Sequence, residues 1–510
     1  MEQSKKKQIS LGVVFSYITI IAQCVSGVIY TPIILSSLGQ SEYGVYSLCI
    51  SFSGYLTIFN GGMNAAFVRF YVQTNTKDKK KIPALNGLFA SIFMILAVLS
   101  LIAGFFISWK AEWFFGTKIS TNEYDLLKHL FVILSFITSV TVINCIFSSL
   151  ITANEQFIFG KLVNLLQIIL APCLTIPLLL KGNGSKTVFF IKLILTIGVA
   201  AFNAWYCFAM LHSKFEFSAV DWVLLRTLLI FAGAIVIQSV MDQFNWQIDK
   251  FVLAWTNGTK EISVYSVGST LNSYYIMIAS AMSGVFIAEI NRLVAMGKDK
   301  ALSELFIKTS RVFAILVFLI MSGYCIFGKA FILRWAGMEY EESYYVGVLL
   351  MLPVTASLTM GLGQDIVRAK NVHKVQIFIN IAVTFCNFLV SIPLAMRMGA
   401  IGSALGTFLC EIVICIIVQS IYYYKVAKLD MKAYYKEMLR MIVGLILPIV
   451  YGVIITMLDL VKVSYPSIGL YGIIYVMIYA ASMWLFAMND YEKGLAIKSV
   501  SRVFGKFRRA

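Results

Sequence analysis

The sequence predicts an all-α membrane protein with fourteen transmembrane helices, arranged as two pseudo-symmetric six-helix lobes plus two extra C-terminal helices. Three observations support this fold class: an apolar composition, long uninterrupted apolar runs and an internal repeat. Of the 510 residues, 59% are hydrophobic and 13% are charged. A water-soluble protein cannot cover so much apolar surface, because its surface-to-volume ratio requires polar residues outside. In lipid, backbone groups must be paired within the chain, so apolar runs without period-two alternation predict helices.

Fourteen apolar runs are long enough to cross a bilayer. They cover residues 10–36, 43–72, 84–107, 127–152, 157–180, 187–211, 222–250, 262–290, 309–333, 344–367, 375–396, 400–424, 438–458 and 468–488. The first run continues to Leu35, which is too long for a cleavable signal peptide, so we interpret it as a membrane anchor. No connection exceeds roughly 20 residues, too few for a separate core. The chain is therefore not predicted to be an enzyme with a soluble catalytic domain.

Basic residues predict the orientation of the chain. Most of the 42 Lys and Arg residues lie in the N-terminus, in the connections after even-numbered runs and in the C-terminal tail. The positive-inside rule places that side, with both termini, in the cytoplasm. The net charge of +17 is explained by attraction to anionic headgroups, so membrane lipids rather than nucleic acid are the expected partner. The nine cysteines form no CxxC motif, and no metal site or cofactor is expected.

The chain also repeats itself. The motif EYGVYSLCISF at Glu42–Phe52 recurs as EISVYSVGSTL at Glu261–Leu271, a displacement of 219 residues. A second match relates Ala153–Asn164 to Ala369–Asn380 at a displacement of 216. Because an even number of runs separates the copies, the repeat is parallel and its axis should follow the membrane normal, which supports a central cavity and alternating access. We expect an N-terminal lobe at 1–215, a C-terminal lobe at 216–425, and the last two helices with a basic tail at 426–510.

Polar side chains inside apolar runs are unfavourable unless they face protein or a water-filled cavity, so their spacing is informative. The seventh run carries four of them at intervals of four, three and four, on one helix face: Gln238, Asp242, Asn245 and Asp249. A displacement of 219 leads to a second stripe in the first run: Thr19, Gln23, Ser26 and Tyr30. We expect the two stripes to line a substrate cavity. The alternative is that Asp249 lies at the outer interface and the others form helix–helix hydrogen bonds.

The second and eighth runs add polar residues to the same expected cavity, namely Asn60, Asn64 and Asn272. Near the cytoplasmic ends of these two runs, Arg69 and Glu289 occupy near-equivalent positions with opposite charge. We hypothesise that they pair across the lobes and close a cytoplasmic gate. The alternative is that each side chain extends to the interface separately.

Four further charged residues are candidates for function. Glu411, near the middle of the twelfth run, is either a site that couples transport to H⁺ or Na⁺ or a buried neutral acid. Asp242 is the second candidate for ion coupling. Arg226 and Arg292 lie near the cytoplasmic mouth, where they could reach an anionic headgroup or simply extend to the interface.

Two segments carry a family resemblance. The segment TPIILSSLGQSEYGVYSLCISFSGYLTIFNGGMNAAFVRFY at Thr31–Tyr71 resembles the oligosaccharide-lipid flippases of bacterial O-antigen and capsule synthesis, often called Wzx. The segment DKFVLAWTNGTKEISVYSV at Asp249–Val267 resembles that family's junction between the seventh and eighth helices. These flippases belong to the multidrug/oligosaccharidyl-lipid/polysaccharide exporter superfamily, and the resemblance covers essentially the whole chain.

The resemblance implies a carrier in the bacterial inner membrane. It would move an undecaprenyl-pyrophosphate-linked oligosaccharide repeat unit from the cytoplasmic to the outer leaflet by alternating access. It also implies a polysaccharide polymerase and assembly proteins as partners. One departure matters, because a pyrophosphate favours cations, yet Lys and Arg are almost absent from the middle of the predicted helices.

The main alternative is a cation-coupled multidrug exporter, or an exporter of another lipid precursor, from the same superfamily. Its cavity would need acidic residues, and Asp242, Asp249 and Glu411 do not exclude it. A membrane glycosyltransferase or polysaccharide polymerase would be expected to have a large outer loop, which this sequence lacks.

Overall fold

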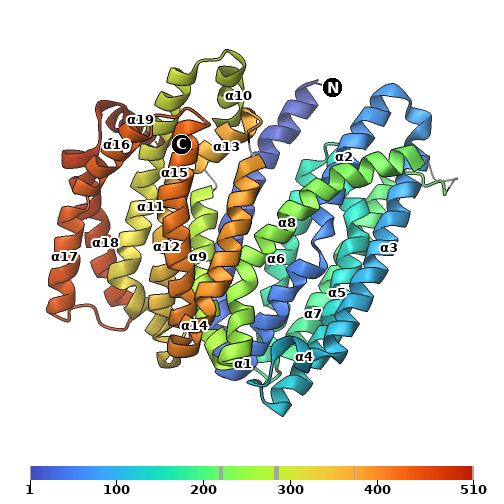
Figure 1. Ribbon diagram of the computed structural model, residues 1–510, viewed down its shortest axis with the longest axis horizontal. Coiled ribbons are helices and arrows are strands. Elements are labelled where there is room, and N and C mark those ends of the chain that lie inside the picture. The colour runs from blue at the N-terminus through green and yellow to red at the C-terminus, as the bar shows by residue number, and fades with distance from the viewer. Residues whose placement is uncertain (1, 218–221, 281–285, 373, 508–510) are drawn as a thin grey trace. The chain divides into compact units, whose positions relative to one another are not determined.

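The computed structural model describes residues 2–217, 222–280, 286–372 and 374–507. All regular secondary structure in these ranges is helical. The chain forms two compact units, shown in Figure 1. Unit 1 comprises residues 1–266 and 391–403, and unit 2 comprises residues 267–390 and 404–510.

Unit 1 contains the first eight α-helices. They are α1 (Glu2–Leu56), α2 (Phe59–Lys77), α3 (Ile82–Trp109), α4 (Ala111–Phe115), α5 (Thr121–Ala153), α6 (Phe157–Leu179), α7 (Ser185–Ala209) and α8 (Trp222–Thr256). The beginning of α9 (Thr259–Ser280) and the middle of α14 (Lys374–Ile412) also belong to it. Within this unit α5 packs between α3 and α7, as Figure 1 shows.

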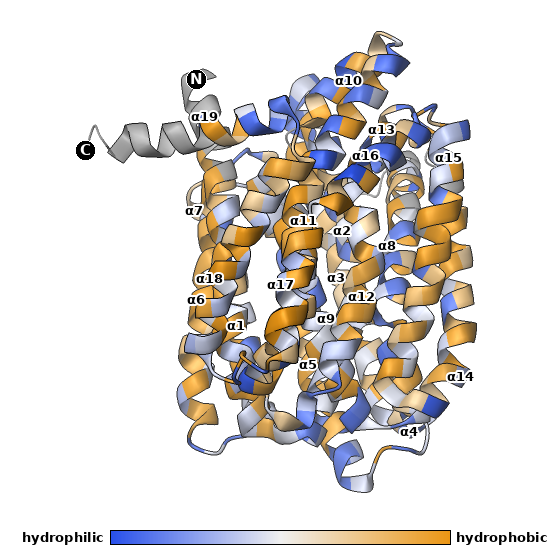
Figure 2. Cartoon of the chain, turned by 90° about the vertical axis from the view of Figure 1, so that its left-hand side faces the viewer, coloured by the Kyte–Doolittle hydropathy of each residue, from blue (hydrophilic) through white to orange (hydrophobic). Residues whose placement is uncertain are grey.

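Unit 2 contains the rest of α9 and α14 together with shorter and bent helices. These are α10 (Ile287–Ala295), α11 (Asp299–Trp335), α12 (Ser343–Thr359), α13 (Gly361–Ala369), α15 (Gln419–Lys425), α16 (Met431–Val443), α17 (Ile446–Met457), α18 (Tyr465–Ser482) and α19 (Asp490–Phe507). Apolar residues follow α17 and α18, whereas hydrophilic residues gather on α10 and α16 (Figure 2).

The helices have the length and composition of membrane spans. Within the described ranges, nine helices are long and apolar enough to cross a membrane, and up to eleven spans result if each of two bent pairs is one span. The chain is therefore an all-helical membrane protein. One candidate, Val14–Lys77, has 64 residues and another, Phe378–Lys425, has 48.

Two glycines turn the chain inside these long candidates. Gly39 in α1 has φ 67° and ψ 175°, and Gly399 in α14 has φ 57° and ψ −135°. Side chains rarely adopt a positive φ, so glycine is the residue that permits both turns. The turn at Gly39 lies between the first and second apolar runs of the sequence. The turn at Gly399 lies between the eleventh and twelfth.

The sequence repeat has a counterpart in hydrogen bonding. The carboxylate of Glu42 accepts a hydrogen bond from the backbone N–H of Ser185 at 2.6 Å, where α7 begins. Its counterpart Glu261 accepts one from the backbone N–H of Ala400, also at 2.6 Å, directly after the turn at Gly399. A carboxylate at a helix start pairs an N–H that has no partner inside the helix. Both copies of the motif thus use their glutamate in the same way, which supports the repeat.

Close packing attaches α8 to α1, at Gly54, and to α2, at Gly62, within unit 1. A Cβ on Gly62 would lie 2.8 Å from the carbonyl oxygen of Ala232, and one on Gly54 would overlap the side chain of Gln243. The absence of side chains at these two positions lets the helices approach closely. The first helix of the predicted C-terminal lobe therefore belongs to the same compact unit as the predicted N-terminal lobe. The division into two six-helix lobes and an extra helix pair stays a prediction.

A buried arginine holds the C-terminal helices of unit 2 together. The guanidinium of Arg311, on α11, donates two hydrogen bonds to Glu492 of α19, at 2.6 and 2.9 Å. It donates a third to Glu437 of α16 at 2.6 Å and a fourth to the backbone oxygen of Ala487 at 2.7 Å. The side chains of Arg311 and Glu492 are 3% and 2% exposed. Such a pair persists because its remaining hydrogen-bonding capacity is also satisfied.

Replacing Arg311 with Met should destabilise the protein by about 3–5 kcal/mol, because Glu492 would remain buried without its partner. Thermal unfolding of the purified protein in detergent measures this loss. Arg440→Met is the matched control, since Arg440 also binds Glu437, at 2.9 Å, but is 64% exposed. An exposed pair contributes about 0–1 kcal/mol, so equal losses in the two variants would contradict the role of Arg311.

Candidate transport site

The predicted polar stripe on α1 follows a partly exposed helix face. Gln23 is exposed, and Ser26 and Tyr30 are half-buried. The Thr19 hydroxyl donates to the backbone oxygen of Phe15 at 2.7 Å, one turn earlier on the same helix. Because this hydroxyl donates within its own helix, it does not donate to a neighbouring helix. Gln23 is thus the member of this stripe that is most accessible to a ligand.

The stripe on α8 changes from exposed to buried along the helix. Gln238 donates to the carboxylate of Asp242 at 2.9 Å, and Asp242 is exposed. Asn245 is half-buried, whereas Asp249 is 1% exposed. A ligand could therefore reach Gln238 and Asp242 directly, while Asp249 is enclosed by protein.

Two hydroxyls enclose Asp249. Tyr265 and Ser403 donate to its two carboxylate oxygens, each at 2.7 Å. Asp249 is thus held inside unit 1 by contacts between helices, and its depth in the membrane stays a prediction. Sequence reasoning missed both donors, because Ser403 lies 154 residues away along the chain.

A second buried polar group lies next to Asp249. The Lys250 ammonium donates to the Ser47 hydroxyl at 3.3 Å, and Ser47 in turn donates to Ser266 at 2.6 Å. Lys250 therefore points into unit 1. The only signal in the sequence that could have revealed the serine pair is the repeat, since 219 residues separate Ser47 from Ser266.

The asparagines of the predicted cavity are largely enclosed. Asn64 accepts a hydrogen bond from Ser149 at 2.8 Å, within unit 1. Asn272, in unit 2, is 3% exposed. The side-chain oxygens of Asn60 and Asn272 are buried and have no hydrogen-bond partner. A buried amide oxygen without a partner is unfavourable, so each of the two retains capacity to accept a hydrogen bond.

The charged residues predicted at the cytoplasmic mouth are exposed. In unit 1, the Arg69 guanidinium lies over the ring of Phe231, 4.5 Å from its centroid, and Arg226 is exposed. In unit 2, Glu289 pairs with Arg292 at 3.4 Å. The pairing of Arg69 with Glu289 would join the two units and stays a prediction. Glu411, also in unit 2, is half-buried.

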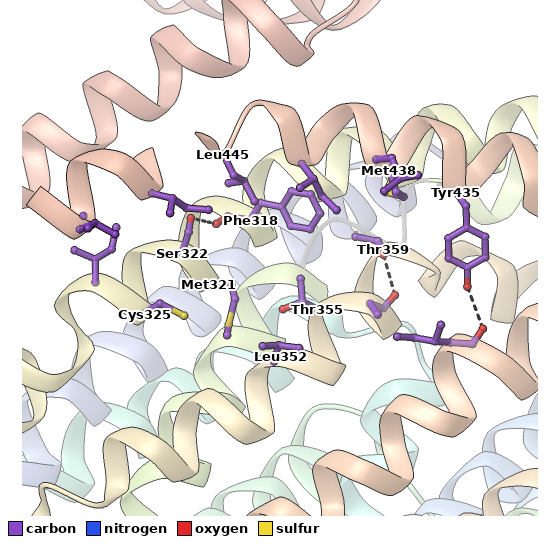
Figure 3. A pocket seen from close by; sticks show the side chains of 18 of the residues that line it. Phe318, Met321, Ser322, Cys325, Leu352, Thr355, Thr359, Tyr435, Met438 and Leu445 are labelled. Atoms are coloured by element: carbon purple, nitrogen blue, oxygen red, sulfur yellow. Dashed lines mark hydrogen bonds between the residues drawn. The ribbon is translucent and has the colours of Figure 1, made fainter. Parts of the chain in front are cut away.

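Unit 2 has an apolar cavity that is open on one side. It has a volume of about 910 Å³ and lies against α11, α12, α16 and α17. Figure 3 shows labelled side chains that line it, including Phe318, Met321, Leu352 and Met438. Sequence reasoning missed this cavity, because its apolar lining is indistinguishable in sequence from residues that face lipid.

The hydroxyls on the cavity wall do not make it polar. Those of Thr355, Thr456 and Tyr435 donate to backbone oxygens at 2.8, 2.8 and 3.0 Å. Thr359 donates to a backbone oxygen at 2.8 Å and shares a further hydrogen bond of 2.8 Å with Tyr434. Because these groups are already paired, the cavity suits a hydrocarbon better than a polar ligand.

Unit 1 thus offers amide and hydroxyl groups on half-exposed helix faces, and unit 2 offers an apolar cavity. Amides donate and accept hydrogen bonds and therefore match hydroxyl-rich ligands. Within the part of the chain that the structure describes, no group of three or more His, Cys, Asp or Glu side chains could hold a metal ion.

Several solved structures with a similar fold are described as a flippase or as transporters. The fold is similar to that of the lipid II flippase MurJ in an inward closed conformation, with a TM-score of 0.72 and 17% identity over 93% of this chain and 98% of that one. It is also similar to an inward-facing multidrug resistance MATE family transporter of the MOP superfamily, with a TM-score of 0.64 and 13% identity over 80% and 95%. The Vibrio cholerae MATE transporter VcmN in its bent form matches with a TM-score of 0.54 and 14% identity over 84% and 98%.

At these identities the likeness establishes the fold, whereas the family rests on sequence. No curated protein matches the chain by sequence. Residues 37–345, more than half of the chain, match the model of the family described as polysaccharide biosynthesis protein. The chain therefore belongs to the polysaccharide biosynthesis protein family, and it shares its fold with proteins described as a lipid II flippase and as a MATE family transporter of the MOP superfamily.

Proposed function

We propose that this protein is a flippase that moves an undecaprenyl-pyrophosphate-linked oligosaccharide repeat unit from the cytoplasmic to the outer leaflet of the inner membrane. The process it serves would be the synthesis of O-antigen, capsule or exopolysaccharide. The observation that carries the proposal is the polar face on α1 and α8, where Gln23 and Asp242 are exposed and the half-buried Gln238 donates to Asp242. Membership in a polysaccharide biosynthesis family supports this choice of cargo.

Each part of the proposed substrate matches a different chemistry in the protein. Sugar hydroxyls pair with the amides and the carboxylate of the two stripes. An isoprenoid tail, which stays in the bilayer, is compatible with the apolar cavity of unit 2. The exposed Arg69, Arg226 and Arg292 could meet the pyrophosphate as it leaves the cytoplasmic leaflet.

We also propose that the chain crosses the membrane fourteen times. A span needs about 20 residues, so the candidates of 64 and 48 residues each provide two crossings, separated by the turns at Gly39 and Gly399. The two bent pairs provide one crossing each. The 22-residue helix α9 adds the remaining one. With an even number of crossings and the basic residues on one side, both termini would be cytoplasmic.

A cation-coupled multidrug exporter is the second candidate function. The exposed carboxylate of Asp242 favours it, because an accessible acid inside a spanning helix could bind a cationic drug or a coupling ion. Glu411 is the other acid proposed to couple transport to H⁺ or Na⁺. A polysaccharide polymerase and assembly proteins are proposed as partners only under the flippase function.

Deleting the gene should make cells accumulate lipid-linked oligosaccharide in the cytoplasmic leaflet, because synthesis would continue without export. The measurement is the accessibility of the labelled glycan to a lectin added to right-side-out and inverted membrane vesicles. The native gene should restore the outward fraction. Unchanged lipid-linked glycan together with altered drug sensitivity would instead identify a multidrug exporter.

Replacing Asp242 with Leu should lower export about tenfold or more, since one charge-assisted hydrogen bond contributes about 1.5–3 kcal/mol. Asp242→Asn should be intermediate, because its amide still bonds to sugar hydroxyls but a neutral hydrogen bond contributes only about 0.5–1.5 kcal/mol. Vesicle export of radiolabelled lipid-linked oligosaccharide measures both variants. If the Asn variant were as inactive as the Leu variant, Asp242 would act in ion coupling rather than in sugar binding.

The proposed gate between Arg69 and Glu289 predicts charge complementarity. Arg69→Glu and Glu289→Arg should each reduce export, because each places like charges together, and the double exchange should restore it. The same vesicle assay measures all three variants. Arg226→Glu combined with Glu289→Arg is the matched control and should restore nothing. A double exchange as inactive as the single variants would show that the two residues act separately.

A further inference from the structure

One end of unit 1 joins the beginning of the second sequence repeat to the first repeat. We call it the capped end and define it by the turns at Gly39, 116–120, 257–259 and Gly399. Glu123, in the first repeat, accepts hydrogen bonds from Ser41 and from Thr259, which belongs to the second repeat. Orientation by basic residues would place the capped end on the outer side of the membrane.

Backbone contacts bring the same turns close together. The Trp255 indole donates to the backbone oxygen of Phe114 at 2.8 Å. A Cβ on Gly258 would lie 2.9 Å from the backbone oxygen of Lys118, and one on Gly44 would overlap the backbone of Thr259. Only glycine therefore fits at positions 44 and 258, where the two repeats meet.

The serine pair lies at a special position in this arrangement. Ser47 and Ser266 are equivalent residues of the repeat, and their hydroxyl oxygens are 2.6 Å apart. In a two-fold arrangement, a residue can touch its own equivalent only close to the symmetry axis. The pseudo-two-fold axis of the repeat therefore passes near this pair. A path between two parallel repeats follows the same axis, so the serine contact obstructs it.

Other groups form layers around the pair. Lys250 donates to Ser47 at 3.3 Å, and its neighbour Asp249 is held by Tyr265 and Ser403. One layer away, the rings of Phe52, Phe115 and Phe251 contact one another with centroids 5.1, 5.2 and 5.7 Å apart. The three rings are apolar. The Ser47–Ser266 contact itself joins two neutral hydroxyls, and water can replace their hydrogen bond when they separate.

We infer that the Ser47–Ser266 contact is a gate at the capped end, closed in this structure, which must separate for cargo to leave on that side. The inference rests on the proposed transport function but not on the identity of the cargo. It differs from the Arg69–Glu289 hypothesis, which concerns the opposite mouth. Gln23 and Ser47 lie on opposite sides of the Gly39 turn. At 1.5 Å per residue, Gln23 is about 12 Å farther from this turn than Ser47. A label that reaches position 23 from outside must therefore pass the gate.

The test joins Ser47→Cys to Ser266→Cys in a background without native cysteines that retains transport. Oxidation should form an intramolecular disulfide, since two side-chain atoms 2.6 Å apart can reach the S–S bond length with small shifts. A third cysteine, Gln23→Cys, reports access from outside by reaction with a membrane-impermeant maleimide. We expect oxidation to lower this labelling at least tenfold, and to lower export equally in the Ser47→Cys, Ser266→Cys protein that keeps Gln23. Reduction should restore both.

The single variants Ser47→Cys and Ser266→Cys are the matched controls, because neither can form the intramolecular disulfide under the same oxidation. Oxidation of either should leave the labelling of Gln23→Cys and, with Gln23 kept, export unchanged. A second variant needs no disulfide: Ser47→Ala with Ser266→Ala should raise outside labelling of Gln23→Cys several-fold, because the closed state loses its central contact.

The outcomes separate the gate from the cargo. Disulfide formation that leaves outside labelling unchanged overturns the gate, as does an alanine pair with unaltered labelling. If the disulfide blocks labelling while the native protein exports no lipid-linked oligosaccharide, the gate stands and the proposed cargo is wrong.

Discussion

Polar groups in membrane-spanning helices must find their partners inside the protein, and the structure depends on this constraint throughout. Glu42 and Glu261 each pair the free backbone N–H that follows a turn. Asp249 is bound on both carboxylate oxygens, and Arg311 makes four hydrogen bonds although its side chain is 3% exposed. Each of these contacts joins helices that are distant in sequence, so satisfying a polar group also defines the packing of the unit.

The same constraint separates structural from functional polar residues. Asp249 and Arg311 have their hydrogen-bonding capacity occupied by protein, which is expected of groups that hold helices together. Gln23 and Asp242 are exposed on spanning helices, where the protein does not use all of their capacity. That difference is why the transport proposal rests on Gln23, Gln238 and Asp242 rather than on Asp249.

The sequence repeat produces two kinds of contact in the structure. It places equivalent glutamates at equivalent helix starts, which stabilises each copy separately. It also brings Ser47 against its own equivalent, Ser266, where the two copies meet. The first kind of contact persists whatever the copies do relative to each other, whereas the second exists only while they touch at the capped end. A carrier that alternates between two states needs both kinds.

The sequence by itself determined the helical membrane class, the two polar stripes and the repeat, because hydropathy and helical spacing are local properties of the chain. It predicted the stripe on α8 but not that Asp249 at its end is enclosed, since Tyr265 and Ser403 come from other segments. It could not reveal the apolar cavity either, because residues lining a cavity and residues facing lipid have the same composition. Only the tertiary structure decided which polar groups are paired and which stay accessible, because that depends on the path of the whole chain.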